Sequence, residues 1–305
     1  MTKKSSFIAV IGAPNAGKST LVNALVGAKI SIVTQKVQTT RARIRGLLTE
    51  GDTQLVFIDT PGIFAPRRRL DRAMVSAAWE GVEGADAILL VVDASEYKNA
   101  NHNSKSISDT DRILAELKSR GAKAMLVLNK IDRVERPELL RVIEKFNEAE
   151  IFTQTFLISA ENGDGVQDLR AHLLEKAPEG AWMYPEDQLS DISDRLMAAE
   201  VTREKVFKRL HQELPYESTV ETTDWSQTKK GELRIEQTIY VSRAGHRPIV
   251  LGKGGATLKA IGEAARTEIA DILGEKVHLF LTVSVREKWA DERARYREMG
   301  LDYTD

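Results

Sequence analysis

The sequence predicts an α/β domain with a mostly parallel sheet, followed by a smaller α+β domain. Three observations lead to this prediction. Short apolar runs alternate with helix-length stretches over the first half of the chain, a stretch containing proline and glycine follows, and the order of elements then changes. Continuous apolar strands that alternate with helices are typical of a parallel sheet covered on both faces. The 305 residues are enough for two domains.

The expected strands of the first domain are five apolar runs: FIAVIG, TQLVFID, DAILLVVDA, KAMLVLNK and QTFLIS. The expected helices cover residues 18–28, 70–83, 109–120, 137–150 and 166–176. The segment RARIRGLLTE at residues 41–50 differs, because apolar and polar residues alternate in it. This pattern suits an edge strand that could run antiparallel to its neighbour.

The second domain begins after APEGAWMYPEDQ, which contains two prolines and a glycine and is typical of a linker. A long helix near residues 190–211 is expected next, then strands near 218–227 and 232–242, a glycine loop, a helix near 256–273 and a strand near 276–286. A charged helical tail follows. This αββααβ-like order indicates a separate α+β domain. We therefore expect one domain at residues 1–180, a linker at 181–190 and a second domain at 191–305.

Composition excludes several classes of protein. The chain is 42% apolar and 29% charged, as in an ordinary globular protein, and we expect no transmembrane helix because no 18-residue apolar window occurs. The apolar run near the N-terminus is too short for a secretory signal. Cysteine is absent, which excludes disulfides and thiolate metal sites and favours the cytosol. We expect a cytoplasmic monomer.

Charge is distributed unevenly along the chain. The net charge is −1, yet residues 226–260 contain seven basic side chains against two acidic ones. A local basic patch can bind nucleic acid even in a protein of low net charge. A solvated charged face is the alternative interpretation.

The segment GAPNAGKST, residues 12–20, fits the pattern G-x-x-x-x-G-K-[ST]. It follows an apolar strand and opens a helix, which is the context that a phosphate-binding loop requires. Backbone N–H groups and the helix N-terminus would bind phosphate oxygens, Lys18 would approach the β- and γ-phosphates, and Ser19 would ligate Mg²⁺. The candidate nucleotide ligands in this loop are Gly12, Asn15, Ala16, Gly17, Lys18, Ser19 and Thr20.

Two further segments favour guanine as the base. LNKID ends an apolar strand with Asn129, Lys130 and Asp132. A carboxylate at Asp132 can accept hydrogen bonds from guanine N1–H and N2, whereas adenine would leave it unpaired. SAENG follows another strand, and the backbone of Ser159 and Ala160 could donate to guanine O6.

Two segments are expected to respond to the γ-phosphate. DTPG places Asp59 near Mg²⁺ and the Gly62 N–H near the γ-phosphate. VQTTRAR offers Thr39 and Thr40, of which we expect Thr40 to complete the metal shell together with Ser19 and Asp59. Residues 29–41 would form the first switch, although a plain connecting loop is the alternative.

These motifs, in this order and at strand ends, resemble the translation-factor-related GTPases over residues 6–176. The resemblance implies a Ras-like domain that binds GTP and Mg²⁺ and hydrolyses the γ-phosphate, with Lys18, Thr40 and Gly62 as candidate catalytic residues. Many such GTPases carry a water-orienting glutamine after the DxxG glycine. Here Ile63 occupies that position and cannot orient water. Asn15 is a candidate ligand for a catalytic K⁺ ion, with a simple turn residue as the alternative.

A second glycine cluster, GKGG at residues 252–255, fits neither the phosphate-loop nor the dinucleotide pattern. It fits G-x-x-G, which in KH domains clamps the backbone of single-stranded nucleotides. We expect an apolar strand-like run, RPIVLG, before this loop and an amphipathic helix after it. The candidate RNA ligands are Arg247, Gly252, Lys253, Gly254, Gly255 and Lys259.

A Ras-like GTPase domain followed by a type II KH domain is similar to the Era family of bacterial ribosome-assembly GTPases. QTTRARIRG, DTPGIF, HRPIVLGKGG and the charged C-terminal segment carry the resemblance over nearly the whole chain. It implies partners: GTP and GDP, the 3′ end of 16S rRNA and the 30S ribosomal subunit. It also implies peripheral association with the inner face of the cell membrane.

Two alternatives remain. One is an RNA- or tRNA-modifying GTPase, although the C-terminal part has neither cysteine nor a recognisable cofactor loop. The other is a GTPase switch that binds a protein through a KH-like domain that has lost RNA binding.

Overall fold

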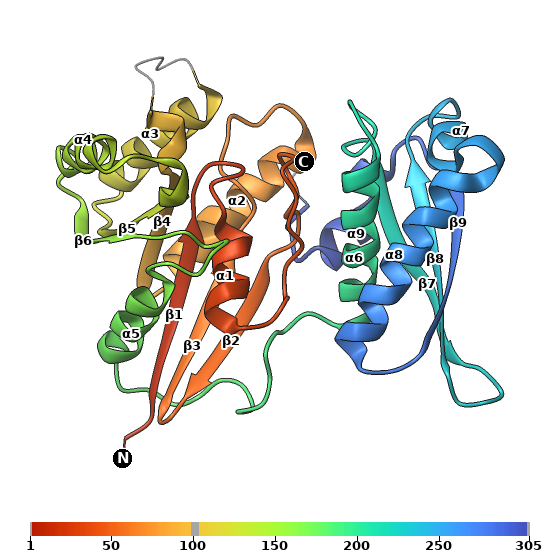
Figure 1. Cartoon of the computed structure of the whole chain (residues 1–305), viewed down its shortest axis with the longest axis horizontal. Coiled ribbons are helices and arrows are strands. Elements are labelled where there is room, and N and C mark those ends of the chain that lie inside the picture. Colours follow the sequence, from red (N-terminus) through yellow and green to blue (C-terminus); the bar gives the residue numbers. More distant parts are fainter. Residues whose placement is uncertain (1, 99–103, 304–305) are drawn as a thin grey trace. The chain divides into compact units, whose positions relative to one another are not determined.

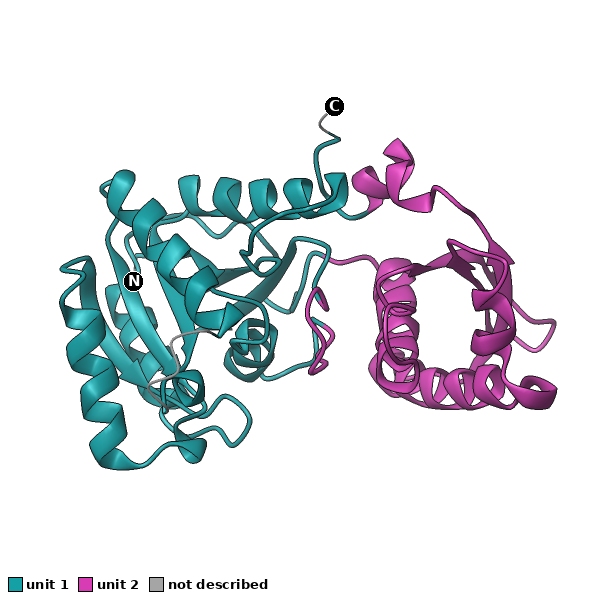
Figure 2. Ribbon diagram, turned by 90° about the horizontal axis from the view of Figure 1, so that it is seen from above, with its two compact units in different colours: residues 1–31, 40–191, 299–305 teal, residues 32–39, 192–298 magenta. Residues whose placement is uncertain are grey.

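A computed structural model describes residues 2–98 and 104–303 of the chain (Figure 1). Packing divides these residues into two compact units (Figure 2). The first unit contains residues 2–31, 40–98, 104–191 and 299–303, and the second contains residues 32–39 and 192–298. Each unit therefore includes one short segment that is distant in sequence from the rest of it. The domain limits expected from the sequence stay a prediction.

The first unit is built on a six-stranded sheet in the order β2-β3-β1-β4-β5-β6. Neighbouring strands are parallel except β2 and β3, which are antiparallel. The expected α/β fold and the antiparallel edge strand are thus confirmed. The strands are β1 (Lys4–Ile11), β2 (Ile44–Glu50), β3 (Thr53–Asp59), β4 (Ala87–Asp93), β5 (Ala124–Asn129) and β6 (Phe152–Leu157).

Helices cover both faces of this sheet (Figure 1). On one face, α2 (Arg69–Glu83), α3 (Lys105–Ser119) and α4 (Arg136–Asn147) bury apolar side chains against β1, β4 and β5 in a single cluster. On the other, α1 (Lys18–Val26) and α5 (Val166–Lys176) contact each other and β3. Helix α3 starts earlier than the sequence predicts, because the Ser104 hydroxyl caps it by accepting from Ser106 N–H.

The parallel strands bring several loops to one edge of the sheet. Strands β1, β3, β4 and β5 are mutually parallel, so their carboxyl ends lie at the same edge. The loops that follow begin at Gly12, Thr60, Ala94 and Lys130, and two of them include the short turns η1 (Ala94–Tyr97) and η2 (Ile131–Arg133). This edge is where ligands of open α/β sheets bind.

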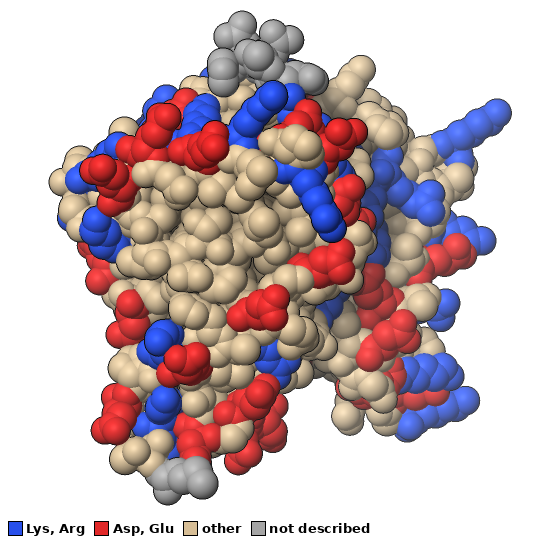
Figure 3. Space-filling model, turned by 60° about the vertical axis from the view of Figure 1, so that its left-hand side comes forward, with Lys and Arg blue, Asp and Glu red and all other residues tan. Residues whose placement is uncertain are grey.

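The sheet ends at β6, which within the described residues pairs only with β5. All six residues of β6 are uncharged, and Leu157 is 37% exposed. Figure 3 shows the side of the molecule where β6 lies, with uncharged surface in the middle and charged side chains toward the margins.

The second unit contains a three-stranded sheet in the order β7-β8-β9. Strands β7 and β8 are antiparallel, and β8 and β9 are parallel. Apolar residues of α6 and α8 pack against this sheet: Val201 and Ile269 lie in one cluster with Ile235 of the sheet, and Val206 and Ile261 lie in another. The elements are α6 (Asp194–Arg209), β7 (Ser218–Gln227), β8 (Leu233–Val241), α7 (His246–Leu251), η3 (Lys253–Gly255), α8 (Ala256–Leu273) and β9 (Val277–Val285).

This order, αββααβ, confirms the predicted α+β unit, but one element was wrongly interpreted. The run RPIVLG lies mostly in helix α7 instead of forming a strand-like segment before the glycine loop. Short apolar runs do not distinguish strand from buried helix. The glycine loop is therefore the turn between two helices, α7 and α8.

The charged C-terminal segment forms the short turns η4 (Trp289–Asp291) and α9 (Arg293–Glu298). Beyond α9 the chain belongs to the first unit, where Met299 C=O accepts a hydrogen bond from Arg43 N–H. Among the helices of residues 2–98 and 104–303, none is long and apolar enough to cross a membrane.

Candidate functional site

The first glycine loop connects β1 to α1, and two of its glycines are required by close contacts. Gly12 has φ 154°, and a Cβ atom there would lie 2.3 Å from Val91 O. Gly17 has φ 98°, and its Cβ would lie 2.1 Å from Asn129 Nδ2. Larger residues rarely adopt such backbone angles and would collide with these neighbours. The loop backbone is thus free of side chains where phosphate oxygens would approach.

A single buried amide connects this loop to the two segments that the sequence predicts to bind the base. Asn129 Nδ2 donates to Ala16 O at 2.8 Å, and Asn129 Oδ1 accepts from Ala160 N–H at 2.9 Å. Asn129 is 2% exposed and Ser159 is fully buried. The predicted residues of three separate segments therefore lie together, and Asn129 acts here by holding the loops in place.

Lys130 joins the same network through its ammonium group. Its Nζ donates to Asn15 O at 2.8 Å and forms an ion pair with Asp93. Asp93 was missed by the sequence analysis, although it is the last residue of β4 and only 7% exposed. An acidic residue that ends a buried parallel strand is the signal that could have identified it.

The candidate guanine-binding carboxylate lies at the margin of this network. Asp132 belongs to η2 directly after β5, and its side chain is 26% exposed. Its Oδ2 is 3.6 Å from Arg133 Nε. The carboxylate is thus accessible to a base while the neighbouring Asn129 is buried.

Lys18 lies inside the loop that precedes its helix. Its Nζ donates to Gly12 O at 3.1 Å and to Ala13 O at 3.0 Å. Burial lowers the pKa of Lys18 to about 8, and the opposing charge of Asp59 limits this shift. A nearby phosphate would favour the charged form of the ammonium.

Three oxygen-bearing side chains predicted to bind Mg²⁺ come together. Ser19 Oγ donates to Asp59 Oδ2 at 2.7 Å and lies 2.8 Å from Thr40 Oγ1. Asp59 is fully buried, and no hydrogen-bond partner of its Oδ1 lies within the described part of the chain. Burial raises the pKa of Asp59, which the Ser19 hydrogen bond and the Lys18 charge partly oppose. Hydroxyl and carboxylate oxygens are the ligands that Mg²⁺ prefers, so the set fits that ion.

The DTPG segment contacts the glycine loop through its backbone. Ile63 N–H donates to Gly12 O at 3.1 Å, and a Cβ at Gly62 would lie 2.9 Å from the Pro14 Cα. Ile63 is 1% exposed and belongs to the apolar core. Its side chain therefore cannot orient a water molecule, as the sequence predicts. The remaining loop candidate, Thr20, lies within the first turn of α1.

The second glycine loop lies at the N-terminus of α8. Gly252, Gly254 and Gly255 have φ values of 72°, 60° and 80°, and a Cβ at Gly252 would lie 2.2 Å from Thr257 Oγ1. Among the described residues no side chain caps α8, so its first N–H groups are available to an anion. Lys253 is exposed within the loop. These features suit a phosphate of a flexible ligand.

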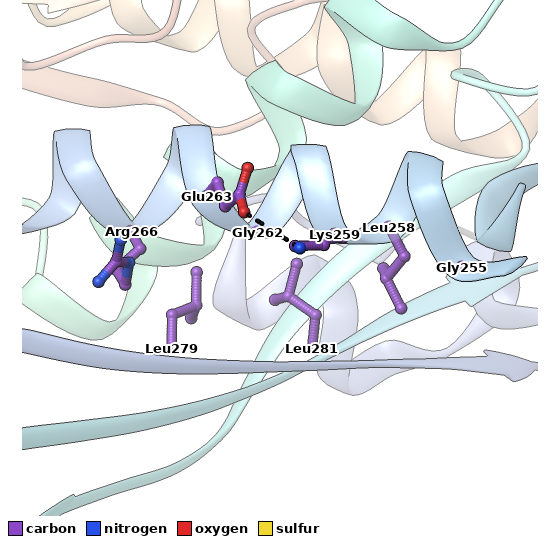
Figure 4. A pocket seen from close by; sticks show the side chains of 8 residues that line it. All are labelled: Gly255, Leu258, Lys259, Gly262, Glu263, Arg266, Leu279 and Leu281. Atoms are coloured by element: carbon purple, nitrogen blue, oxygen red, sulfur yellow. Dashed lines mark ion pairs between the residues drawn. The ribbon is translucent and has the colours of Figure 1, made fainter.

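A groove of about 470 Å³ continues from this loop between α8 and β9 (Figure 4). Its lining combines three leucines with two glycines and three charged side chains. The lining residues are Gly255, Leu258, Lys259, Gly262, Glu263, Arg266, Leu279 and Leu281. The leucines form an apolar floor, and Lys259, Glu263 and Arg266 lie at its margins. A groove beside a G-x-x-G loop is where KH domains hold a single strand.

The RNA candidates are distributed unevenly around this groove. Lys259 lines it and lies 3.9 Å from Glu263, whereas Arg247 Nε donates to Val283 O and connects α7 to β9. Val250 before the glycine loop and Ile261 after it are buried in the core and do not line the groove.

Arg266, Gly262, Leu279 and Leu281 also line the groove, although the sequence patterns did not predict them. The spacing of Gly255, Leu258, Gly262 and Arg266 places all four on one face of α8, which is the signal that could have identified part of the set.

Family models match both parts of the chain. A model described as 50S ribosome-binding GTPase matches residues 7–130, and one described as KH domain matches residues 213–290. Among curated relatives, GTPase Era of Brucella suis is 57% identical over 300 residues, which cover 98% of this chain and 94% of that protein. GTPase Era of Caulobacter vibrioides is 56% identical over 98% of this chain and 97% of its own.

Two solved structures are similar over nearly their full length. One is Era in complex with MgGDPNP and nucleotides 1506–1542 of 16S ribosomal RNA, with a TM-score of 0.90 and 34% identity. The match covers 98% of this chain and 99% of the Era chain in that structure. The other is an Era variant of Aquifex aeolicus bound to GDP·AlF4⁻, with a TM-score of 0.89 and 34% identity over 97% of this chain and 99% of that one.

The lowered pKa of Lys18 predicts proton uptake on nucleotide binding at alkaline pH. Above about pH 8 the free protein holds Lys18 largely neutral, whereas the bound diphosphate favours the ammonium form. GDP affinity should fall about fivefold between about pH 8 and about pH 9, because the charged fraction of Lys18 in the free protein falls by that factor. Titration calorimetry in two buffers of different ionisation heat should detect about one proton taken up at about pH 9 and almost none at about pH 7. Equal heats in both buffers at the higher pH would contradict the role of Lys18.

Proposed function

Because the chain belongs to the Era family of GTPases, we propose that it is a GTP-controlled switch that binds the 3′ end of 16S rRNA and assists assembly of the 30S subunit. Hydrolysis of GTP is the activity of the family, and a Ras-like GTPase domain with a C-terminal KH domain is its architecture. The RNA part of the proposal is supported by the similar Era structure that contains nucleotides 1506–1542 of 16S rRNA. The observation that carries it is the uncapped glycine loop of α8 beside the groove with its apolar floor.

We assign GTP to the first glycine loop and the segments around it. In this proposal the loop backbone and Lys18 hold the phosphates, and Asp132 reads guanine. Ser19, Thr40 and Asp59 hold Mg²⁺, which would supply charge stabilisation at the transferring phosphate. The support is the convergence of these three oxygens and the anchoring of the base segments by Asn129.

We assign single-stranded RNA to the second glycine loop and its groove. The backbone of Gly252–Gly255 and the N-terminus of α8 would hold a phosphate, while Leu258, Leu279 and Leu281 would contact bases. Lys253, Lys259 and Arg266 would add electrostatic attraction to the strand. The cytoplasmic location, the peripheral membrane association and the monomeric state stay predictions.

Lys253→Ala should weaken RNA binding and reduce its salt dependence. One phosphate contact would be lost, so the slope of log affinity against log salt should fall by about one. The measurement is fluorescence anisotropy with a single-stranded oligonucleotide at several KCl concentrations. Lys118→Ala, which removes an exposed lysine from α3 of the first unit, is the matched control. If the salt slope of Lys253→Ala is the same as that of the wild type, Lys253 does not contact the RNA backbone.

Asp132→Asn should change the nucleotide that the protein prefers. The amide that replaces the carboxylate can donate a hydrogen bond to the C2 oxygen of xanthine, but it cannot accept both hydrogen bonds from guanine. One polar group of guanine is then left unpaired. GTP affinity should therefore fall by about tenfold or more. Competition binding of GTP against xanthosine triphosphate measures this. Asp111→Asn, an exposed change on α3, should leave the preference unaltered. Undiminished GTP affinity in Asp132→Asn would exclude Asp132 from base recognition.

We further propose that Asn15 helps to bind a K⁺ ion that stabilises the transferring phosphate. Ile63 is buried and offers no polar group to the reacting phosphate. The negative charge that develops on the transferring phosphate must therefore be stabilised by another group. Asn15 lies in the phosphate loop with φ 65°, and its carbonyl accepts from Lys130. Wild-type turnover should be faster in KCl than in NaCl, and Asn15→Ala should abolish the difference. Equal rates for both proteins in both salts would exclude a K⁺ role.

A further inference from the structure

The groove beside the second glycine loop has a gap in its helical wall. Helix α8 lines the groove with residues spaced at three and four, which places them on one face of the helix. Within this face Leu258 and Arg266 carry long side chains, and Gly262 lies midway between them (Figure 4). The two long side chains start about 12 Å apart along the helix axis, because each residue advances the helix by about 1.5 Å. Gly262 therefore leaves a stretch of helix backbone without a side chain on this wall.

The opposite wall is uncovered at the same level. Side chains alternate along a strand, so the odd-numbered residues of β9 from 277 to 283 share one face. Val277 and Val283, at the two ends of this row, are buried. Leu279 and Leu281 lie between them and are only partly buried. A Cβ atom at Gly262 would lie 3.4 Å from Leu281 Cδ1, so apolar surface of β9 is left open where α8 has no side chain.

The fold itself does not require a glycine at this position. Gly262 lies in the interior of an 18-residue helix and is not among the glycines with positive φ. Outside its own helix, an added Cβ would approach only Leu281 among the described residues, and 3.4 Å is an ordinary van der Waals contact. Gly252 is different, because it has φ 72° and a Cβ there would collide with Thr257. Backbone geometry and packing thus explain Gly252 but not Gly262.

A glycine inside a helix destabilises the fold relative to alanine, because the unfolded chain has more conformational freedom to lose. Glycine is typical of places where a ligand comes close to the backbone. The gap at Gly262 is bordered by leucines, and the exposed ion pair of Lys259 and Glu263 lies beside it, with 3.9 Å between Nζ and Oε1 (Figure 4). The flat apolar face of a nucleobase suits such a surface better than a phosphate does.

We propose that Gly262 is a binding residue for RNA and that its missing side chain admits one nucleobase between the backbone of α8 and Leu281. This inference rests on the proposed binding of single-stranded RNA to the groove. It adds a position for one base to the phosphate contacts assigned to Gly252–Gly255. A side chain at position 262 would take the space of that base.

Gly262→Ala separates RNA binding from stability. Its affinity for a short single-stranded RNA from the 3′ end of 16S rRNA should fall about tenfold, which lies within the range for one stacked base. Its melting temperature should stay at or above that of the wild type, because alanine favours the helix. The measurements are fluorescence anisotropy and thermal unfolding of the full-length protein, with every variant bound to the same non-hydrolysable GTP analogue.

Gly81→Ala is the matched control. Gly81 is an interior glycine of α2 in the first unit, and a Cβ there would also lie 3.4 Å from an apolar carbon, Ile58 Cγ2. This variant should bind RNA as the wild type does. Gly262→Leu should weaken RNA binding further than Gly262→Ala, because leucine also favours a helix but fills more of the gap. Equal RNA affinity of Gly262→Leu and the wild type would exclude the subsite.

An abasic scan of the RNA tests whether a base is the group that meets Gly262. At one position of the oligonucleotide, removal of the base should weaken binding to the wild type and abolish the difference between the wild type and Gly262→Ala. If the difference persists at every abasic position, a base does not occupy the gap and the proposal is wrong.

The remaining outcomes distinguish this inference from the proposed function. If the wild type binds the RNA and Gly262→Ala binds it equally well, the inference fails while the RNA function stands. If Gly262→Ala melts well below the wild type, the glycine is required by the fold, and the inference fails for that reason. If the wild type binds no single-stranded RNA, the proposed function fails and the inference fails with it.

Discussion

Both candidate sites depend on one constraint, which is that backbone N–H groups must come close to a phosphate. A side chain at Gly12 or Gly252 would collide with neighbouring atoms at 2.3 Å or 2.2 Å. Each loop also ends at a helix N-terminus without a side-chain cap, at Gly17 before α1 and at Gly255 before α8. Glycines and free helix N-termini together make an anion site without any added charge.

The two sites differ in what surrounds the glycines. At the first, Lys18 and Asp59 are buried, and Asn129 connects the loop to the segment of Ala160. This enclosure suits a compact ligand with a metal ion. At the second, Lys253 is exposed and the loop opens into a groove lined by leucines. An open groove suits a strand whose phosphates and bases are contacted in turn.

Local sequence patterns predicted much of this arrangement. The strand-loop-helix order around Gly12–Thr20 and the αββααβ order of the second unit follow from apolar runs and glycines. Helix α7 was misread because its apolar run is too short to show helical period. The packing of residues 32–39 on α6 and the position of Asp93 depend on contacts between distant segments, which no local pattern contains.

The central claim is that one chain binds GTP and single-stranded RNA at separate phosphate sites and that the first controls the second. The most direct measurement is the affinity of a single-stranded RNA oligonucleotide for the full-length protein with Mg²⁺ and either a non-hydrolysable GTP analogue or GDP. RNA binding should be clearly tighter with the GTP analogue than with GDP. Equal affinity in both nucleotide states, or no RNA binding in either, would contradict it.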